Sequence, residues 1–291
     1  PIAKASGAVD GDIALPNFRD IQAKIAFSPF ENHTFYLNGI SSRDNTELTS
    51  GASRKQADSI SIFDKSFNDV AGLTWVWSPT TKLITTTTLS YYQNTGANNF
   101  GGEGGSNSLF GDTVTRESLE KIQDSLRKLG LEVPRLYSIE GSTSFNFKKT
   151  SIKSDVSWNI SPEHLIEVGG AVDFITTGVN FEIIFDPRLK ALRASNPRIA
   201  ALPESFGTSI DYLRTNVYVQ DNIKITKDLT VQPGLRFDRF EIIDRSYISP
   251  RLSASYALDP TTTLRAAWGI YYQSPGYEKL FDRQVFLDLT T

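Results

Sequence analysis

Residues 151–164 read SIKSDVSWNISPEH, and this stretch contains the pattern that decides the fold. Its apolar residues fall on even positions, and polar residues fill the odd positions between them. The apolar residues are Ile152, Val156, Trp158 and Ile160. A period of two residues is typical of a β-strand with one apolar and one polar face. After a tight turn at Ser161-Pro162, Ile166 and Val168 begin a second alternating segment, so the stretch predicts an antiparallel hairpin.

The same unit of strand, tight turn and strand recurs along the chain. The short turns lie at residues 28–32, 78–82, 161–164, 226–228 and 259–262. Most of the other connections are far longer, at residues 44–67, 94–149 and 177–211. Short turns at one end of a sheet and long loops at the other are typical of an outer-membrane β-barrel. We count about ten strands, each near the 9 to 11 residues that a tilted strand needs to cross a bilayer.

A soluble β-sandwich also alternates apolar and polar residues, and it is the main alternative fold. Charged residues occupy the polar face of the predicted strands, which a dry sandwich core would not tolerate without partners. Aromatic residues gather near strand ends, where the interfacial girdles of a barrel lie. They include Phe27, Phe30, Trp75, Trp77, Tyr91, Tyr92, Trp158, Tyr271 and Tyr272. We therefore predict an all-β protein, an antiparallel transmembrane β-barrel over residues 1–291, with periplasmic turns and extracellular loops.

One short helix is expected within the longest loop, near residues 116–129. Thr115 can cap its start, acidic residues lie in its first turns, and Gly130 follows its end. This loop opens with a run of asparagine and glycine at residues 98–105, which we expect to be a flexible tip.

Composition and motifs exclude several classes of function. The chain has 291 residues, a net charge of −3 and no cysteine. A nucleic-acid partner is not expected from an acidic chain, and cysteine-based catalysis and disulfides are impossible. His33 and His164 lie near different short turns without spaced partners, so we predict neither a metal site nor a catalytic site, no enzyme activity and no cofactor. The start at Pro1-Ile2-Ala3 suggests an interior fragment of a longer precursor.

The candidate functional residues are charged side chains on the polar face of the later strands. They are Arg214, Arg236, Asp238, Arg251 and Arg265. On the polar wall of a barrel they could line a channel and meet a solute or a plug. The alternative is a set of mutually neutralised ion pairs that brace the wall.

The last third of the chain resembles the barrel of TonB-dependent receptors. The segments that carry the resemblance are YVQDN at 218–222, LTVQPGLRFD at 229–238, ISPRLSASY at 248–256 and TLRAAWGIYYQSP at 263–275. They follow the order of the family's Gln-Asp, Gly-Leu-Arg-aromatic-Asp, Ser-Pro-Arg and Leu-Arg-Ala strands. The specific match covers about residues 212–280, and the rest agrees in architecture.

The resemblance implies a 22-stranded, plugged barrel in the outer membrane of a Gram-negative bacterium. Such a receptor binds a scarce solute, such as a siderophore or an oligosaccharide, at its extracellular loops and imports it with energy relayed by TonB. Its partners would be outer-membrane lipid, the TonB system and that solute. Two other functions stay open: a passive porin without a plug, and a surface barrel with an adhesive or structural role.

Overall fold

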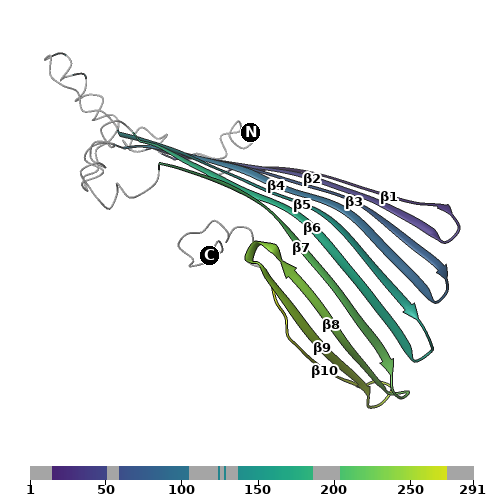
Figure 1. Ribbon diagram of the computed structural model, residues 1–291. Coiled ribbons are helices and arrows are strands. Elements are labelled where there is room, and N and C mark those ends of the chain that lie inside the picture. Colours follow the sequence, from purple (N-terminus) through teal and green to yellow (C-terminus); the bar gives the residue numbers. More distant parts are fainter. Residues whose placement is uncertain are drawn as a thin grey trace.

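The computed structural model describes residues 15–50, 59–104, 137–185 and 204–273, together with Asp124 and Lys128. These residues form one antiparallel sheet of ten strands, which pair in sequence order and curve from one edge to the other (Figure 1). The strands are β1 (Leu15–Phe30), β2 (His33–Ser50), β3 (Ser59–Thr80), β4 (Leu83–Gly104), β5 (Tyr137–Asn159), β6 (His164–Phe185), β7 (Ser205–Lys224), β8 (Leu229–Phe240), β9 (Arg245–Ala257) and β10 (Thr263–Gly269). The predicted all-β antiparallel fold and the number of strands are confirmed.

The first seven strands are much longer than the sequence pattern predicts. They contain between 16 residues in β1 and 23 in β5. The predicted boundaries of the loops 44–67, 94–149 and 177–211 are wrong, because the strands that precede these loops continue to Ser50, Gly104 and Phe185. Part of the expected flexible tip, residues 98–104, lies in β4 and pairs with β5. A strand of 22 residues spans roughly 70 Å, whereas the bilayer core is about 30 Å thick. Beyond the bilayer both faces of a sheet can contact water, so no alternation marks these extensions.

The five short turns are confirmed, and each joins an odd-numbered strand to the next one. Polar side chains within the turns bind the backbone. Thr80 accepts a hydrogen bond from the amide of Lys82 at 3.2 Å, and Thr226 accepts one from the amide of Leu229 at 3.0 Å. Such local bonds favour turns over continued strand. In the first turn Asn32 adopts a left-handed conformation with φ of 64°, which asparagine tolerates better than most residues.

The turn between β9 and β10 is held by Asp259. Its Oδ1 accepts hydrogen bonds from the Thr261 hydroxyl at 2.7 Å and from the amides of Thr261 and Thr262 at 2.8 and 2.9 Å. These bonds, the Thr261 hydroxyl first among them, hold the pKa of the Asp259 carboxyl below its ordinary value. In the turn between β5 and β6, the Ser161 hydroxyl lowers the pKa of Glu163 in the same way.

The connection between β8 and β9 is short, unlike the long loops. It is a single 3-10 turn, η2 (Glu241–Ile243), and it ends at Asp244 in a left-handed conformation with φ of 49°. The helix expected over 116–129 lies outside the described residues except for Asp124 and Lys128, which are helical. No helix in the described ranges is long and apolar enough to cross a membrane.

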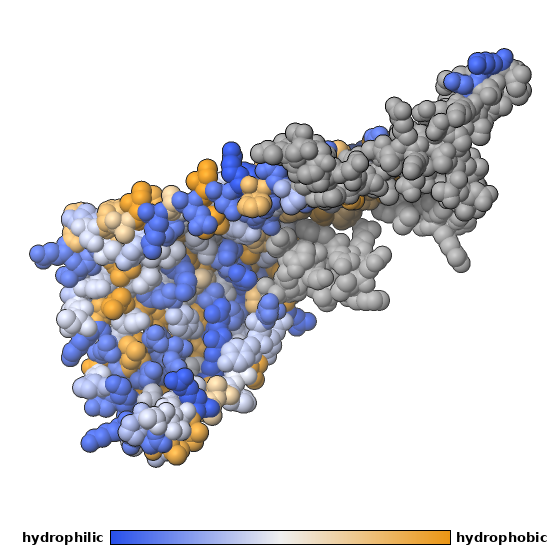
Figure 2. Space-filling model, turned by 180° about the vertical axis from the view of Figure 1, so that it is seen from behind, coloured by the Kyte–Doolittle hydropathy of each residue, from blue (hydrophilic) through white to orange (hydrophobic). Residues whose placement is uncertain are grey.

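The two faces of the sheet differ in chemistry and in crowding. One face, here called the polar face, carries every buried residue other than glycine on the described strands: Ser151, Asp173, Ile175, Thr177, Asp238, Phe240 and Ser249. A curved sheet brings side chains together on its concave side, so the polar face is the concave one. In the space-filling view from behind, hydrophilic and hydrophobic residues are interspersed over the sheet (Figure 2). This mixture agrees with strands that are apolar at alternate positions.

The opposite face is convex and apolar near the short turns. Its exposed residues follow the register from strand to strand, and they include Ile25, Leu37, Leu73, Leu89, Ile152, Val168, Val219, Leu235, Leu252 and Trp268. So large an exposed apolar surface is unfavourable in water and favourable against lipid.

Candidate functional site

The structure places all five predicted site residues on the polar face of β7 to β10. Arg214 lies on β7, Arg236 and Asp238 on β8, Arg251 on β9 and Arg265 on β10. The register aligns Arg214 with Phe240, which is two residues from Asp238, and aligns Arg236 with Ser249, which is two residues from Arg251. Because residues two apart on a strand share a face, the five side chains belong to one wall. Their environments nevertheless divide them into paired and unpaired groups.

Arg214 belongs to a buried cluster with residues of the two preceding strands. Its Nε and Nη2 donate to Oδ2 of Asp173 at 2.9 and 2.6 Å, and the hydroxyl of Ser151 donates to Oδ1 of the same carboxylate. Ser151, Asp173 and Arg214 are direct neighbours in the register of β5, β6 and β7. The Asp173 side chain is only 6% exposed, so its charge depends on these donors.

Arg236 and Asp238 bind each other along β8. Nε and Nη2 of Arg236 donate to Oδ1 of Asp238 at 3.0 and 2.8 Å, and Nε also lies 2.9 Å from Oδ2. The Asp238 side chain is 7% exposed. This fork-like contact is among the stronger arrangements of an ion pair, since it satisfies two donors with one carboxylate.

A second polar cluster, which sequence reasoning did not find, links β5 to β7 across β6. The Tyr218 hydroxyl donates to Oδ1 of Asp155 at 2.8 Å, and Nζ of Lys153 lies 2.7 Å from Oδ2. The tyrosine ring crosses Gly169 of β6, where a built Cβ would lie 2.6 Å from a ring carbon. The glycine therefore makes room for the ring, which joins two strands that are not neighbours.

Arg251 and Arg265 differ from the other three predicted residues. Neither forms an ion pair with another described residue. The guanidinium of Arg251 lies over the ring of Tyr271, 4.9 Å from its centroid, and its buried Nε has no hydrogen-bond partner in the described part of the chain. Arg265 is exposed and lines a hollow of about 370 Å³ between β8, β9 and β10.

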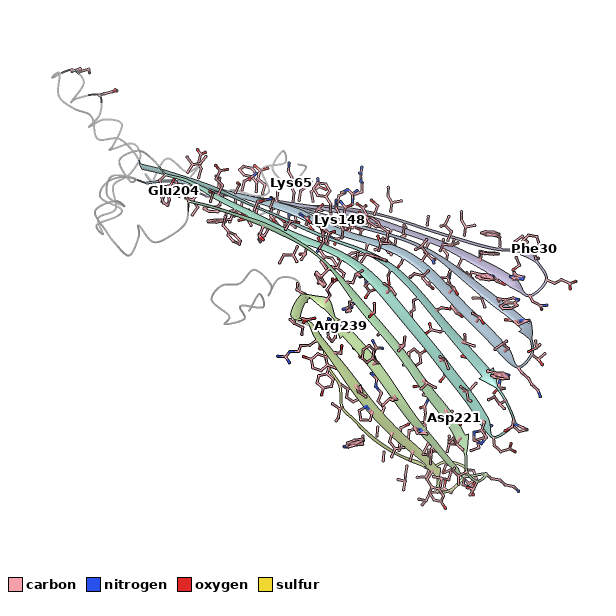
Figure 3. The ribbon with its side chains drawn as sticks, in the orientation of Figure 1. Phe30, Lys65, Lys148, Glu204, Asp221 and Arg239 are labelled. Carbon is pink, nitrogen blue, oxygen red and sulfur yellow. The ribbon has the colours of Figure 1, made fainter. Side chains whose placement is uncertain are left out.

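Aromatic residues mark the edge of the convex apolar surface that lies nearest the short turns. The rings of Phe27 and Phe35 stack at 5.3 Å, and the His33 ring lies nearly parallel to those of Trp75 and Trp77, with centroids at 5.7 and 6.1 Å. Nε1 of Trp75 donates to Nδ1 of His33 at 2.9 Å. The side chains lie at the short-turn end, where Figure 3 also shows Phe30 and Asp221, whereas Lys65 and Lys148 lie toward the other end. This cluster has the composition and position of an interfacial girdle.

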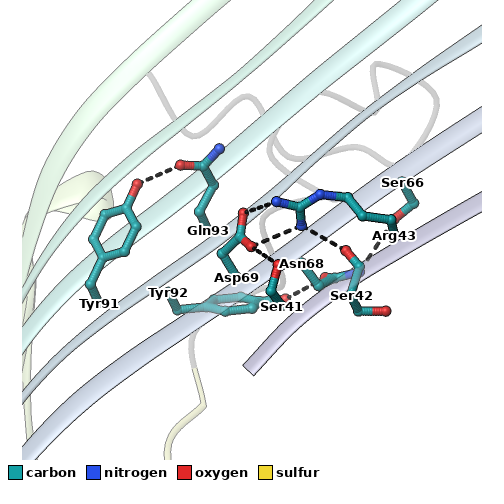
Figure 4. A network of polar contacts seen from close by, with 9 residues as sticks. All are labelled: Ser41, Ser42, Arg43, Ser66, Asn68, Asp69, Tyr91, Tyr92 and Gln93. Carbon is teal, nitrogen blue, oxygen red and sulfur yellow. Dashed lines mark hydrogen bonds and ion pairs between the residues drawn. The ribbon is translucent and has the colours of Figure 1, made fainter. Parts of the chain in front are cut away.

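The other edge of the apolar surface is marked by the ion pair of Arg43 and Asp69 (Figure 4). Nη1 and Nη2 of Arg43 donate to Oδ1 and Oδ2 of Asp69 at 2.8 and 3.2 Å, and the Ser41 hydroxyl donates to Oδ1 at 2.8 Å. On β3 this pair lies about eight residues from the girdle residue Trp77, or roughly 25 Å along the strand. That length is close to the apolar band of about 25 Å in transmembrane barrels. Tyr91 lies beside this edge on β4, not at a strand end as expected, because β4 continues to Gly104.

Neither histidine has the neighbours of a metal ligand. Nδ1 of His164 lies 2.7 Å from Oδ2 of Asp221, a partner 57 residues away that spacing in the sequence did not reveal. No group of three or more potential ligands is found among the described residues.

Comparison with known proteins identifies the architecture. Residues 12–288 match a family model described as TonB dependent receptor-like, beta-barrel. The structure of the RagAB peptide importer in the closed-closed state is similar to the chain with a TM-score of 0.52 and 10% identity, covering 87% of this chain and 33% of that one. The ferric yersiniabactin uptake receptor FyuA from Yersinia pestis gives a TM-score of 0.49 at 10% identity and covers 88% of this chain and 35% of that one. A search of the curated proteins found no match.

The chain thus spans about a third of the length of these solved structures. The family match extends over nearly all of the sequence, well beyond the segments 212–280 from which the resemblance was inferred. It agrees with the curved antiparallel sheet, its apolar convex face and its ion-paired polar face. The chain belongs to the TonB-dependent receptor β-barrels, which are transport proteins of the Gram-negative outer membrane.

Proposed function

We propose that the protein containing this chain binds a scarce solute at its extracellular loops and imports it with energy from TonB. The observation that carries the proposal is the match to the TonB-dependent receptor barrels over residues 12–288. The division of the sheet into a lipid-compatible convex face and a hydrogen-bonded polar face supports it. In this proposal the polar face lines the lumen, the short turns face the periplasm, and a plug outside this chain contacts TonB.

The polar face suits passage of a solute because several of its charges are already neutralised. Asp173 binds Arg214, Asp238 binds Arg236, and Asp155 binds Lys153. A wall built in this way is polar and rigid but binds a passing solute only weakly. Selectivity would then depend on the loops, and we propose that residues 105–136 contribute to solute capture.

Two measurements test the proposal against the passive porin and the surface barrel. The purified whole protein should be nearly silent in a planar lipid bilayer, whereas an unplugged porin gives stepwise ion conductance. Cells that express the protein should grow on at least one limiting source of iron or carbon only when TonB is functional. Stepwise conductance, or growth that is indifferent to TonB on every source, would refute coupled import.

Deleting residues 105–136 from the whole protein tests the role of the longest loop. We expect the deletion to weaken binding of the solute identified by the growth test while the barrel still inserts into the membrane. Unchanged affinity in a correctly inserted protein would show that this loop does not capture the solute.

A further inference from the structure

β7 extends well beyond the end of β8, so part of its edge has no neighbouring strand in the described part of the chain. β6 pairs with β7 from Ser205 to Ile223. β8 pairs with it only from Arg214 onward, because β8 ends at Phe240 and η2 turns the chain back. Figure 1 shows β7 continuing past this turn, away from the short turns. Residues 205–213 therefore form a strand edge that is open on the side of β8.

The hydrogen bonds of β7 show which of its backbone groups face the open edge. The amide of Lys224 donates into the turn that precedes β6, and the carbonyl of Glu204 accepts from the amide of Ile183 on β6. Even-numbered residues thus direct their backbone groups toward β6. The amide of Leu213 instead donates to Oε2 of Glu241 in η2 at 2.6 Å. Odd-numbered residues therefore face the open edge, and Glu241 satisfies the first of their amides that has no partner on β8.

Beyond Leu213 the outward backbone groups of the edge have no such partner. No described residue bonds to the outward N–H and C=O groups of Ser205, Gly207, Ser209 and Asp211, and all of these residues are exposed. Their side chains on the convex face are polar or absent, whereas a lipid-facing strand would carry apolar residues there. Unpaired backbone groups are also too costly for the bilayer interior. This edge is therefore reached by water, and it is a ready template for another strand.

The two faces beside the open edge differ in chemistry. Phe206 and Ile210 lie on the concave face, and the register aligns Phe206 with Phe181 of β6. Ser209 and Asp211 lie on the convex face. A strand added at this edge would place alternate side chains beside an apolar surface and beside a polar one. The edge is therefore suited to a sequence in which apolar and polar residues alternate.

We propose that the open edge of β7 binds a short extended peptide, which joins the sheet as an additional strand. Peptides that bind in this way gain affinity from main-chain hydrogen bonds and specificity from alternate side chains. The edge from Ser205 to Asp211 is roughly 20 Å long, which suits a peptide of about seven residues. Apolar side chains would contact Phe206 and Ile210, and a basic side chain would lie beside Asp211. The inference rests on the proposed transport function and assigns an oligopeptide class to the solute.

The test measures peptide binding to the whole purified receptor by titration calorimetry. The probe is an acetylated and amidated heptapeptide in which valine alternates with threonine or lysine. We expect it to bind, and Ser209→Pro to weaken its binding about tenfold or more, because proline lacks the N–H and its ring obstructs the edge. The outward amide of Ser209 does not pair with β6, so the fold should tolerate proline. Ser209→Thr is the matched control, because it keeps the N–H and should bind the peptide as the unchanged receptor does.

Two modified peptides test whether a single backbone edge makes the contact. In an extended strand the N–H groups of successive residues point to opposite edges. Methylation of the valine amides removes the donors from one edge of the peptide, and methylation of the other amides removes them from the opposite edge. We expect one modified peptide to lose affinity about tenfold or more and the other to bind like the unmodified peptide.

Three outcomes would overturn the proposal. Equal binding to Ser209→Pro and Ser209→Thr would exclude the edge of β7. Equal loss of affinity in both methylated peptides would exclude pairing through one strand edge. Absence of peptide binding would overturn it as well. If ligand-free Ser209→Pro were then less stable to heat than Ser209→Thr, or had lost self-association, the edge would be covered by the receptor itself or by a second copy.

The calorimetry requires no TonB, so its result is independent of the test of coupled import. Peptide binding at this edge together with uptake that does not require TonB would refute the proposed function but not the binding site. TonB-dependent uptake without peptide binding would refute the binding site alone.

Discussion

Replacement of Arg214 by alanine should be one of the more destabilising single changes in the wall. It leaves Asp173, whose side chain is 6% exposed, bonded to the Ser151 hydroxyl but without its arginine partner. Removing one partner of a buried ion pair costs about 3–5 kcal/mol, because the other charge stays desolvated. Arg214 itself is 32% exposed, so part of the site is already hydrated. We therefore expect a loss of about 3 kcal/mol, at the lower end of this range.

The opposite change, Asp173→Ala, should cost less. The remaining arginine has a long side chain and can turn its guanidinium toward water, whereas the aspartate cannot move its carboxylate out of the wall. We expect a loss of about 2 kcal/mol, most of it from the hydrogen bonds of Arg214 and Ser151. In the double variant the losses should not add, and the coupling energy should be about 1–2 kcal/mol.

Chemical denaturation of the whole protein in lipid vesicles, followed by tryptophan fluorescence, measures these free energies of unfolding. The control is Arg239→Ala, since Arg239 binds Asp244 at an exposed site where the acid side chain is 87% exposed. An exposed ion pair contributes about 0–1 kcal/mol. If Arg214→Ala cost no more than Arg239→Ala, or if the two changes in the buried pair were strictly additive, the reasoning from burial would be wrong.

Three further predictions use the same measurement. Tyr218→Phe removes the hydroxyl that donates to Asp155 and should cost about 1 kcal/mol, with unchanged strand content by circular dichroism. Gly169→Ala should lower the free energy of unfolding by about 1–3 kcal/mol, because the added Cβ would overlap the Tyr218 ring. Gly39→Ala is the control and should leave the stability nearly unchanged, because a Cβ at Gly39 would lie 3.9 Å from its nearest neighbour, the carbonyl oxygen of Val70. Asp259→Asn should be destabilising near neutral pH but not in strong acid. Because the folded pKa of Asp259 is lowered, its stabilisation is complete above the unfolded pKa and disappears as the pH falls through the folded pKa; a difference that persisted below that pH would contradict the assignment.

Strand number and turn positions could be predicted because lipid imposes a rule on the sequence. Wherever the convex face contacts the bilayer, every second residue must be apolar, and turn residues interrupt the pattern. The rule ends with the bilayer, which explains the errors at residues 44–50, 94–104 and 177–185. Those segments continue the strand pairing without regular alternation of apolar and polar residues.

The candidate wall could be predicted only as a set of residues. Alternation places Arg214, Arg236, Asp238, Arg251 and Arg265 on one face, but it does not say which charges meet. Arg214 binds a residue 41 positions away, and that contact depends on the register of β6 with β7. The two alternatives, channel-lining groups and bracing ion pairs, therefore apply to different members of the set. Three residues are in ion pairs, and Arg251 and Arg265 have none with the residues that the structure describes.

Glycine on the polar face makes room for aromatic rings of the neighbouring strands. Three times an aromatic ring lies over the glycine directly opposite it on the neighbouring strand, namely Phe145 over Gly96, Phe100 over Gly141 and Tyr218 over Gly169. A ring that lies along the wall covers the exposed backbone of the glycine and does not project from the sheet. A larger residue at any of these glycines would push the ring away from the wall. At these three positions the wall therefore stays free of projecting aromatic side chains, because each ring lies in the space that the glycine leaves.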